Sequence, residues 1–170
     1  MQAGSSSVHF VAIDTQGIRQ NLNDRDSQID FIADRLSTST GDWKIVFGHH
    51  PPYTTGGHAP GSTSIRDYVV PLMEANNVDI FLSGHDHNLE YLRKIDNRDI
   101  DYVISGAGGR GLYLKNPLAD AELEITVGIE SVMHEADHGF MYFEITPTQI
   151  TMDFINDQGN RVYQLIRSKP

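Results

Sequence analysis

Apolar residues follow two successive patterns along the chain, and the first pattern alternates strands with helices. Three short, mostly apolar runs are typical of buried strands: 8–14, 43–47 and 78–82. Helical spacing predicts a helix at 27–36 with Ser27 as its N-cap, and another at 65–75, where Pro71 predicts a kink or a late start. The residues expected to face inward from the first helix are Ile29, Phe31, Ile32 and Leu36. This order predicts a parallel sheet with right-handed crossovers.

After residue 87 the pattern changes to short runs separated by turns, which indicates antiparallel strands. The expected strands are 89–93, 101–105, 139–145, 149–155 and 161–166. The expected turns include Asn97-Arg98 and Gln158-Gly159-Asn160. The segment 113–138 is irregular, with acidic residues and histidines, and we expect a surface loop or lid there. The whole chain, 1–170, is therefore expected to form a single α/β (α+β) domain with a mixed sheet.

Composition narrows the class of function. The chain has 170 residues and a formal net charge of −10, which argues against nucleic-acid binding through a basic face. It has no cysteine, so disulfides and thiolate metal sites are excluded. No apolar run reaches the roughly 18 residues of a membrane span, so no membrane partner is expected. The first seven residues lack the basic and apolar regions of a signal peptide.

Two histidine motifs follow two of the expected parallel strands. Gly48-His49-His50-Pro51 comes after the strand at 43–47, and Gly84-His85-Asp86-His87 comes after the strand at 78–82. The carboxyl ends of parallel strands meet at one edge of a sheet, so these motifs are expected to lie together. Asp14 ends the strand at 8–14 and is expected at the same edge, as a turn or supporting residue and not as a ligand.

The spacing within these motifs indicates a metal site. Residues two apart in an extended segment point the same way, so His85 and His87 can face one centre or two adjacent ones. His49 would join them from the neighbouring strand, with His50 as the alternative ligand if His49 is buried. Imidazole suits zinc, iron and manganese. Asp86, between the two histidines, is expected to point away and to bond to the backbone.

Five stretches together resemble the calcineurin-like metallophosphoesterases, and within them the purple acid phosphatase branch of the tartrate-resistant type. These stretches are 10–15, 48–51, 84–92, 105–108 and 139–147. They match the C-terminal half of the family domain. The resemblance implies part of a four-layer αββα sandwich, to which this half contributes one mixed sheet with an exposed apolar face. It also implies hydrolysis of phosphate monoesters.

The resemblance also implies roles for four histidines. His49 and His85 would bind the divalent metal of a two-metal centre, and His87 would bind the other metal, which is usually ferric. The full protein would therefore hold iron together with zinc, manganese or a second iron. His58 stands nine residues after His49, at the family's spacing, and would be the catalytic acid. The pKa of histidine, which is near neutrality, suits that role.

Part of the family's ligand set does not occur in these 170 residues. The family's Asp-x-His, Gly-Asp-x-x-Tyr and Gly-Asn-His-Asp segments supply two aspartates, a tyrosine and an asparagine, and none of the three segments is present. Three histidines cannot fully coordinate two cations. We therefore expect the chain alone to hold zero or one metal ion firmly and to be inactive, with an N-terminal half or a second chain completing the site.

Other interpretations stay open at this point. A truncated, non-catalytic module that binds metal or dimerises would account for the missing carboxylates, and a phosphodiesterase of the same superfamily would share the histidines. His134 and His138 are expected to lie in a solvated loop. Localisation is undetermined by the sequence, and the resemblance slightly favours an exported protein.

Overall fold

The computed structural model describes residues 2–3, 6–22, 25–96 and 99–169. The helices are α1 (Thr15–Gln20), α2 (Arg25–Ser37), α3 (Thr63–Tyr68), α4 (Val70–Ala75) and α5 (Pro117–Val127). The strands are β1 (Gln2–Ala3), β2 (Ser6–Ala12), β3 (Trp43–Phe47), β4 (Ile80–Ser83), β5 (Leu89–Lys94), β6 (Asp101–Ser105), β7 (Ile129–Glu135), β8 (Gly139–Ile145), β9 (Gln149–Asn156) and β10 (Arg161–Ser168). All eight strands expected from the sequence are present, and the turn expected at 97–98 lies outside the described residues.

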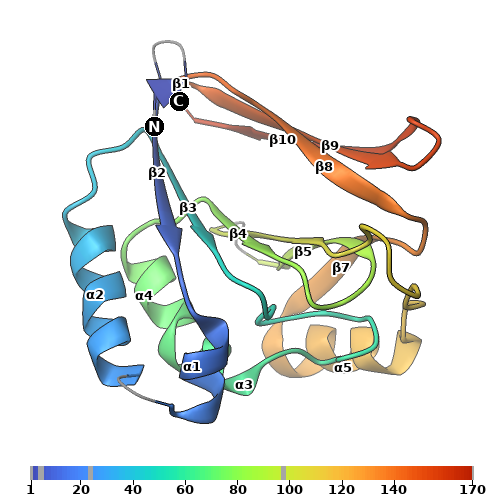
Figure 1. The fold of residues 1–170 in the computed structure, drawn as a ribbon, viewed down its shortest axis with the longest axis horizontal. Helices are drawn as coiled ribbons and strands as arrows, with labels where there is room; N and C mark the ends of the chain where they lie inside the picture. Colours follow the sequence, from blue (N-terminus) through green and yellow to red (C-terminus); the bar gives the residue numbers. More distant parts are fainter. Residues whose placement is uncertain (1, 4–5, 23–24, 97–98, 170) are drawn as a thin grey trace.

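The larger sheet is mixed and is covered by helices on one face (Figure 1). Its strand order is β1-β2-β3-β4-β6-β5-β7, with β2, β3, β4 and β6 parallel and β5 antiparallel to both of its neighbours. Val11, Val46 and Phe81 pair across the three central parallel strands and pack in one cluster with Ile32 and Leu36 of α2. Ile45 and Ile80 point to the opposite face and are buried in a second cluster, so burial on both faces explains the mostly apolar runs in the sequence.

The smaller sheet, β10-β9-β8, packs against the other face of the larger sheet (Figure 1). The indole nitrogen of Trp43 donates to the carbonyl of Thr146 at 2.7 Å. Arg167 of β10 binds the buried carboxylates of Asp79 at 3.3 Å and Asp101 at 3.2 Å. The expectation that this chain contributes only one sheet is therefore wrong, because the antiparallel strands after residue 138 form a separate layer.

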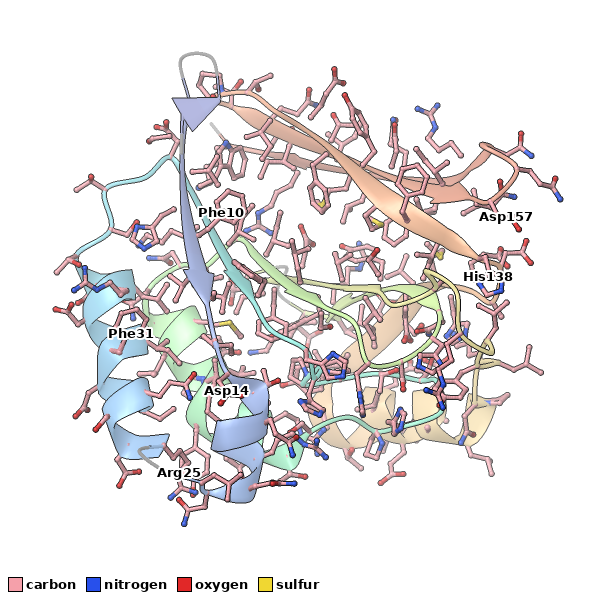
Figure 2. The ribbon with its side chains drawn as sticks, viewed as in Figure 1. Phe10, Asp14, Arg25, Phe31, His138 and Asp157 are labelled. Carbon is pink, nitrogen blue, oxygen red and sulfur yellow. The ribbon has the colours of Figure 1, made fainter. Side chains whose placement is uncertain are left out.

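One part of the larger sheet remains uncovered on the face that carries the smaller sheet. Phe10 and Phe47 are each 40% exposed, and their rings lie edge to face at 6.4 Å between centroids. They line an open hollow of about 540 Å³ together with Gly48, Leu82 and Ser83. Figure 2 shows Phe10 on the side of β2 that faces away from α2. On the larger sheet, the expected exposed apolar face is thus a limited surface toward the carboxyl ends of β2, β3 and β4.

The helices differ from the expectation in detail. Ser27 is not an N-cap, because α2 begins at Arg25 and encloses it. Phe31 is 48% exposed, since its ring lies under the guanidinium of Arg35 and not in the core. The helix expected at 65–75 is divided into α3 and α4, and Pro71 lies in the first turn of α4, where its missing amide hydrogen costs nothing.

The expectation of a loop or lid at 113–138 is wrong, because this segment contains α5 and β7. The side chain of Asn116 accepts hydrogen bonds from the first turn of α5, and Gly128 ends the helix with φ of 70°. Only Ala119 and Leu123 of α5 are buried, whereas Leu118 and Ile125 are each 83% exposed. Apolar residues on both faces of the helix hide its periodicity in the sequence.

Candidate metal centre

His49 and His85 lie side by side where β3 and β4 end. Nδ1 of His85 is 3.0 Å from Nε2 of His49. His50 joins them, and one ligand nitrogen from each of the three histidines lies within 4.8 Å of the others. His49 is exposed and His50 is buried, so the alternative in which His49 is buried is wrong. The expected convergence of the two motifs at one edge of the sheet is confirmed.

The backbone around His85 is unusual and depends on a glycine from another strand. His85 has φ of 67°, in the left-handed region that residues other than glycine seldom adopt and that is enriched at functional sites. Gly106 follows β6, and a Cβ atom there would lie 1.8 Å from the carbonyl oxygen of Asp86. Only glycine therefore allows the loop after β6 to approach the segment that carries His85.

Two histidines of this cluster, His50 and His85, have lowered pKa values and favour the neutral form. Burial lowers the pKa of His50 to about 4, and the nearby charge of Arg19 adds to the effect. Burial also lowers the pKa of His85 to about 4, with contributions from the neighbouring His58 and His49. A neutral imidazole keeps the lone pair that a metal ligand needs. Thr15 fixes the His50 ring, because its hydroxyl lies 2.7 Å from Nδ1.

The spacing of the cluster fits one metal ion. Two nitrogens bound to one ion at about 2.1 Å stand roughly 3.0 to 3.4 Å apart at ligand angles between 90° and 109°. The separation of 3.0 Å between His49 and His85 lies in this range. Among the described residues, the cluster contains histidines and no carboxylate. The donor set thus fits part of one coordination sphere and leaves positions open.

His87 lies outside this cluster. Its Nδ1 is 2.8 Å from the carbonyl oxygen of Gly111, and its ring stacks on Tyr113 with centroids 4.5 Å apart. It lines an open hollow of about 510 Å³ that also includes His49 and His85. Of the two arrangements that the spacing allowed, the geometry therefore favours adjacent centres over a single shared one.

His58 stands over the cluster and is held by Asp86. Its ring lies 4.0 Å from that of His85, measured between centroids. Its Nδ1 bonds to the Asp86 carboxylate, which also accepts the backbone N–H of His58 at 3.1 Å. Asp86 is fully buried and points away from the cluster toward this loop, as expected. The carboxylate leaves Nε2 of His58 available for a substrate.

Asp14 lies at the same end of the sheet as the histidine cluster, but its side chain caps a helix (Figure 2). Its carboxylate accepts the backbone N–H groups of Gln16 at 3.0 Å and Gly17 at 3.1 Å. It is therefore the N-cap of α1, a short helix that the sequence analysis did not predict. The expected turn or supporting position of Asp14 agrees with this arrangement.

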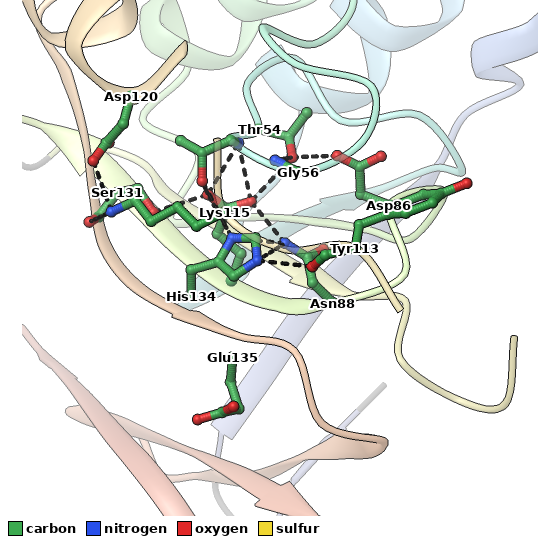
Figure 3. Close-up of polar contacts among 12 residues, drawn as sticks. Thr54, Gly56, Asp86, Asn88, Tyr113, Lys115, Asp120, Ser131, His134 and Glu135 are labelled. Carbon is green, nitrogen blue, oxygen red and sulfur yellow. Dashed lines mark hydrogen bonds and ion pairs between the residues drawn. The ribbon is translucent and has the colours of Figure 1, made fainter. Parts of the chain in front are cut away.

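Sequence reasoning missed a buried polar network behind His58 (Figure 3). Glu90 is fully buried in β5. Its carboxylate accepts five hydrogen bonds: from the Thr54 hydroxyl at 3.0 Å, the Thr55 N–H at 3.1 Å, the Thr55 hydroxyl at 2.6 Å, Asn88 at 3.1 Å and Ser131 at 2.9 Å. The single hydroxyl proton of Thr54 is shared between Glu90 and the carboxylate of Asp86. Glu90 therefore fixes the loop that leads to His58.

His134 of β7 completes this network and is not in a solvated loop as expected. Its side chain is 3% exposed, with Nδ1 3.7 Å from Oε1 of Glu90 and Nε2 3.0 Å from the carbonyl oxygen of Tyr113. His138 is also part-buried, with Nδ1 3.0 Å from the carbonyl oxygen of Ala107. His134 is buried because β7 pairs with β5 where a loop was expected, and His138 lies in the short connection between β7 and β8.

Glu90 and His134 lie 3.7 Å apart, and each side chain favours the charged form of the other. Burial alone would raise the pKa of Glu90, but the bonds from His134 and Thr55 outweigh it and leave that pKa below its usual value. Burial alone would lower the pKa of His134, but the carboxylate of Glu90 outweighs this effect and raises the pKa of His134. The sequence signal for this pair was a glutamate inside an apolar strand, since every residue of 89–92 is buried.

The family of the chain follows from a direct comparison. The family model described as calcineurin-like phosphoesterase matches residues 3–89, which is half of the chain. The chain therefore belongs to the calcineurin-like phosphoesterase family. The resemblance inferred from the histidine motifs is confirmed, and membership implies phosphoester chemistry with metal ions.

Relatives within this family are acid phosphatases by name. Tartrate-resistant acid phosphatase type 5 of Sus scrofa is 30% identical over 148 residues, which is 85% of this chain and 42% of the relative. Purple acid phosphatase 17 of Arabidopsis thaliana is 35% identical over 136 residues, which is 79% of this chain and 38% of the relative. The chain spans less than half the length of these relatives.

Two solved structures share the fold. A purple acid phosphatase from yellow lupin seeds (Lupinus luteus) superposes with a TM-score of 0.79 at 19% identity, over 96% of this chain and 31% of that chain. GAP50, the anchor in the inner membrane complex of Plasmodium, superposes with a TM-score of 0.75 at 25% identity, over 96% and 50%. The expected fold class is confirmed. Within the described residues, no helix is long and apolar enough to cross a membrane.

Proposed function

We propose that this chain supplies the histidine side of a dinuclear metal centre that hydrolyses phosphate monoesters. The observation that carries the proposal is the 3.0 Å approach of His85 to His49 beneath the ring of His58. His49 and His85 would hold the divalent ion, and His87 the second ion, which the family resemblance gives as iron beside zinc, manganese or iron. When bound, such ions neutralise phosphate charge and generate a hydroxide nucleophile near neutral pH.

His58 is the proton donor in this proposal. Asp86 holds Nδ1, which orients the ring and leaves Nε2 to face the ester oxygen of the leaving group. A proton delivered to that oxygen matters most when the departing alkoxide is a strong base. Burial of Asp86 and its hydrogen bond to the His58 backbone keep the ring in place before substrate arrives.

The remaining ligands would come from outside these 170 residues. The cluster offers histidines and, within the described part of the chain, no carboxylate. The uncovered surface at Phe10 and Phe47 adjoins Gly48, directly before His49. An N-terminal half of the same domain, or a second chain, would pack on this apolar surface and bring its carboxylates to the metals. The chain alone would then hold zero or one ion firmly.

The test is hydrolysis by the protein as its gene encodes it. We expect p-nitrophenyl phosphate to be hydrolysed faster than bis(p-nitrophenyl) phosphate. The variant His85→Ala should lose at least about 100-fold in rate, the scale on which metal sites respond to ligand-sphere changes. The matched control is His9→Gln, a histidine of β2 outside the cluster. Equal rates for the two variants would refute the proposal, and a preference for the diester would favour a phosphodiesterase.

A second candidate function is a non-catalytic module. GAP50, with the same fold, is described as an anchor. The exposed rings of Phe10 and Phe47 would suit a structural interface equally well. Under this alternative, the complete protein would bind a partner through the apolar surface without turnover of either ester.

A further inference from the structure

A small pocket opens beside the histidine cluster on the side of His58. It has a volume of about 190 Å³. Its lining residues are Arg19, His50, Pro51, His58, Gly61, Ser62 and His85. No carboxylate lines this pocket among the described residues, although the chain has 23 acidic and 13 basic residues. The pocket is therefore locally cationic on an acidic protein, which favours an anionic ligand.

Arg19 supplies the permanent charge of this pocket. It lies in the last turn of α1, whose first turn is fixed by Asp14. Its guanidinium makes no hydrogen bond or ion pair with any residue that the structure describes, whereas Arg66 and Arg167 bind carbonyls or carboxylates. A guanidinium in a pocket that no carboxylate lines retains its full capacity for a carboxylate or phosphoryl group.

The position of Arg19 relative to His58 indicates which part of a substrate Arg19 binds. The proposed function puts His58 next to the leaving-group oxygen, so a pocket shared by His58 and Arg19 lies on the leaving-group side. We propose that Arg19 binds a second anionic group, a carboxylate or a phosphoryl group, on the leaving group of the substrate. This inference rests on the proposed function for the direction in which the substrate lies.

The volume of the pocket limits the size of that leaving group. The pocket measures about 190 Å³. Pockets for drug-sized ligands usually measure about 300 to 1,000 Å³. The preferred substrates are therefore small phosphate esters with two anionic groups close together.

Binding of three non-hydrolysable probes to the complete, metal-loaded protein tests this inference without turnover. Methylphosphonate carries one anionic group, phosphonoacetate adds a carboxylate, and methylenediphosphonate adds a second phosphonate. By calorimetry, the unmodified protein should bind the two larger probes at least about fivefold more tightly than methylphosphonate. Arg19→Gln should remove this preference by weakening them about tenfold, the size expected for one charge-assisted hydrogen bond. The two probes distinguish the carboxylate from the phosphoryl group.

Arg35→Gln is the matched control, because Arg35 is exposed on α2, outside the pocket, and its loss changes the net charge equally. It should leave the preference intact. The inference is overturned if the unmodified protein shows no preference, if Arg19→Gln weakens the binding of all three probes alike, or if Arg35→Gln acts like Arg19→Gln. Turnover of p-nitrophenyl phosphate by the complete protein tests the proposed function separately, so normal turnover without a binding preference would refute only the assignment of Arg19.

Discussion

Replacement of Glu90 by glutamine should destabilise the protein strongly, although it changes only one oxygen to an amide nitrogen. Glu90 is fully buried, accepts five hydrogen bonds and lies 3.7 Å from His134, whose side chain is 3% exposed. Removing one partner of a buried ion pair costs about 3–5 kcal/mol, because the other charge is left uncompensated. For a domain of this size, that loss lowers the melting temperature by about 10 °C.

The assay is urea and thermal unfolding followed by circular dichroism. Glu130→Gln is the matched control, because Glu130 pairs with Arg93 at 2.7 Å but is 36% exposed. An exposed pair of this kind contributes about 0.2–1 kcal/mol. The double variant Glu90→Gln, His134→Gln should lose less unfolding free energy than the two single variants lose together, since it leaves no unpaired charge. Additive losses, or equal losses for Glu90 and Glu130, would refute the reasoning.

The same pair gives the stability a predictable dependence on pH. Because the pKa of His134 is raised, its contribution to the free energy of unfolding is complete below the usual value of 6.5. That contribution is lost as pH rises through the folded-state pKa. Because the pKa of Glu90 is lowered, its contribution to the free energy of unfolding is complete above pH 4.5, its usual pKa. That contribution is lost as pH falls through the folded-state pKa. The pair should therefore contribute fully between pH 4.5 and 6.5, and Glu90→Gln should flatten the decline at higher pH. An unchanged pH profile in that variant would contradict the pairing.

Three further outcomes follow from the site and the exposed surface. Asp14→Ala should cost about 1 kcal/mol in urea unfolding, because it removes the N-cap of α1, and a change under 0.2 kcal/mol would show that the cap is dispensable. His58→Asn in the complete enzyme should slow hydrolysis of an alkyl phosphate far more than that of p-nitrophenyl phosphate, whose leaving group needs no proton; equal slowing would remove His58 as the acid. Phe47→Asp should reduce self-association of the isolated chain in sedimentation velocity, since it places a charge in the exposed apolar hollow; unchanged association would show that the hollow is not a contact surface.

The sheet and the histidine cluster were predictable because each has a strong local signal. The strand at 43–47 was predicted to the residue, since its apolar run is short and bounded by a turn before it and Gly48 after it. The meeting of His49 and His85 followed from parallel topology alone, because neighbouring parallel strands end at one edge of the sheet.

The parts that sequence reasoning missed depend on tertiary contacts. The helix α5 carries exposed apolar residues opposite its buried ones, so no single face stands out in the sequence. The pairing of Glu90 with His134 joins residues 44 positions apart, and His134 was assigned to solvent because its segment was taken for a loop. The burial of Glu90 had a local signal, an acid inside an apolar strand, but its partner had none.

The central claim is that this chain supplies only the histidine ligands of a metal centre that is completed from outside the chain. The most direct test measures metal content and turnover of the isolated chain on one purified sample. Elemental mass spectrometry gives the stoichiometry, and p-nitrophenyl phosphate gives the turnover. We expect no more than one metal ion per chain and no turnover, because the histidine cluster contains no carboxylate among the described residues. Two ions per chain with sustained turnover would contradict the proposal that the remaining ligands come from outside this chain.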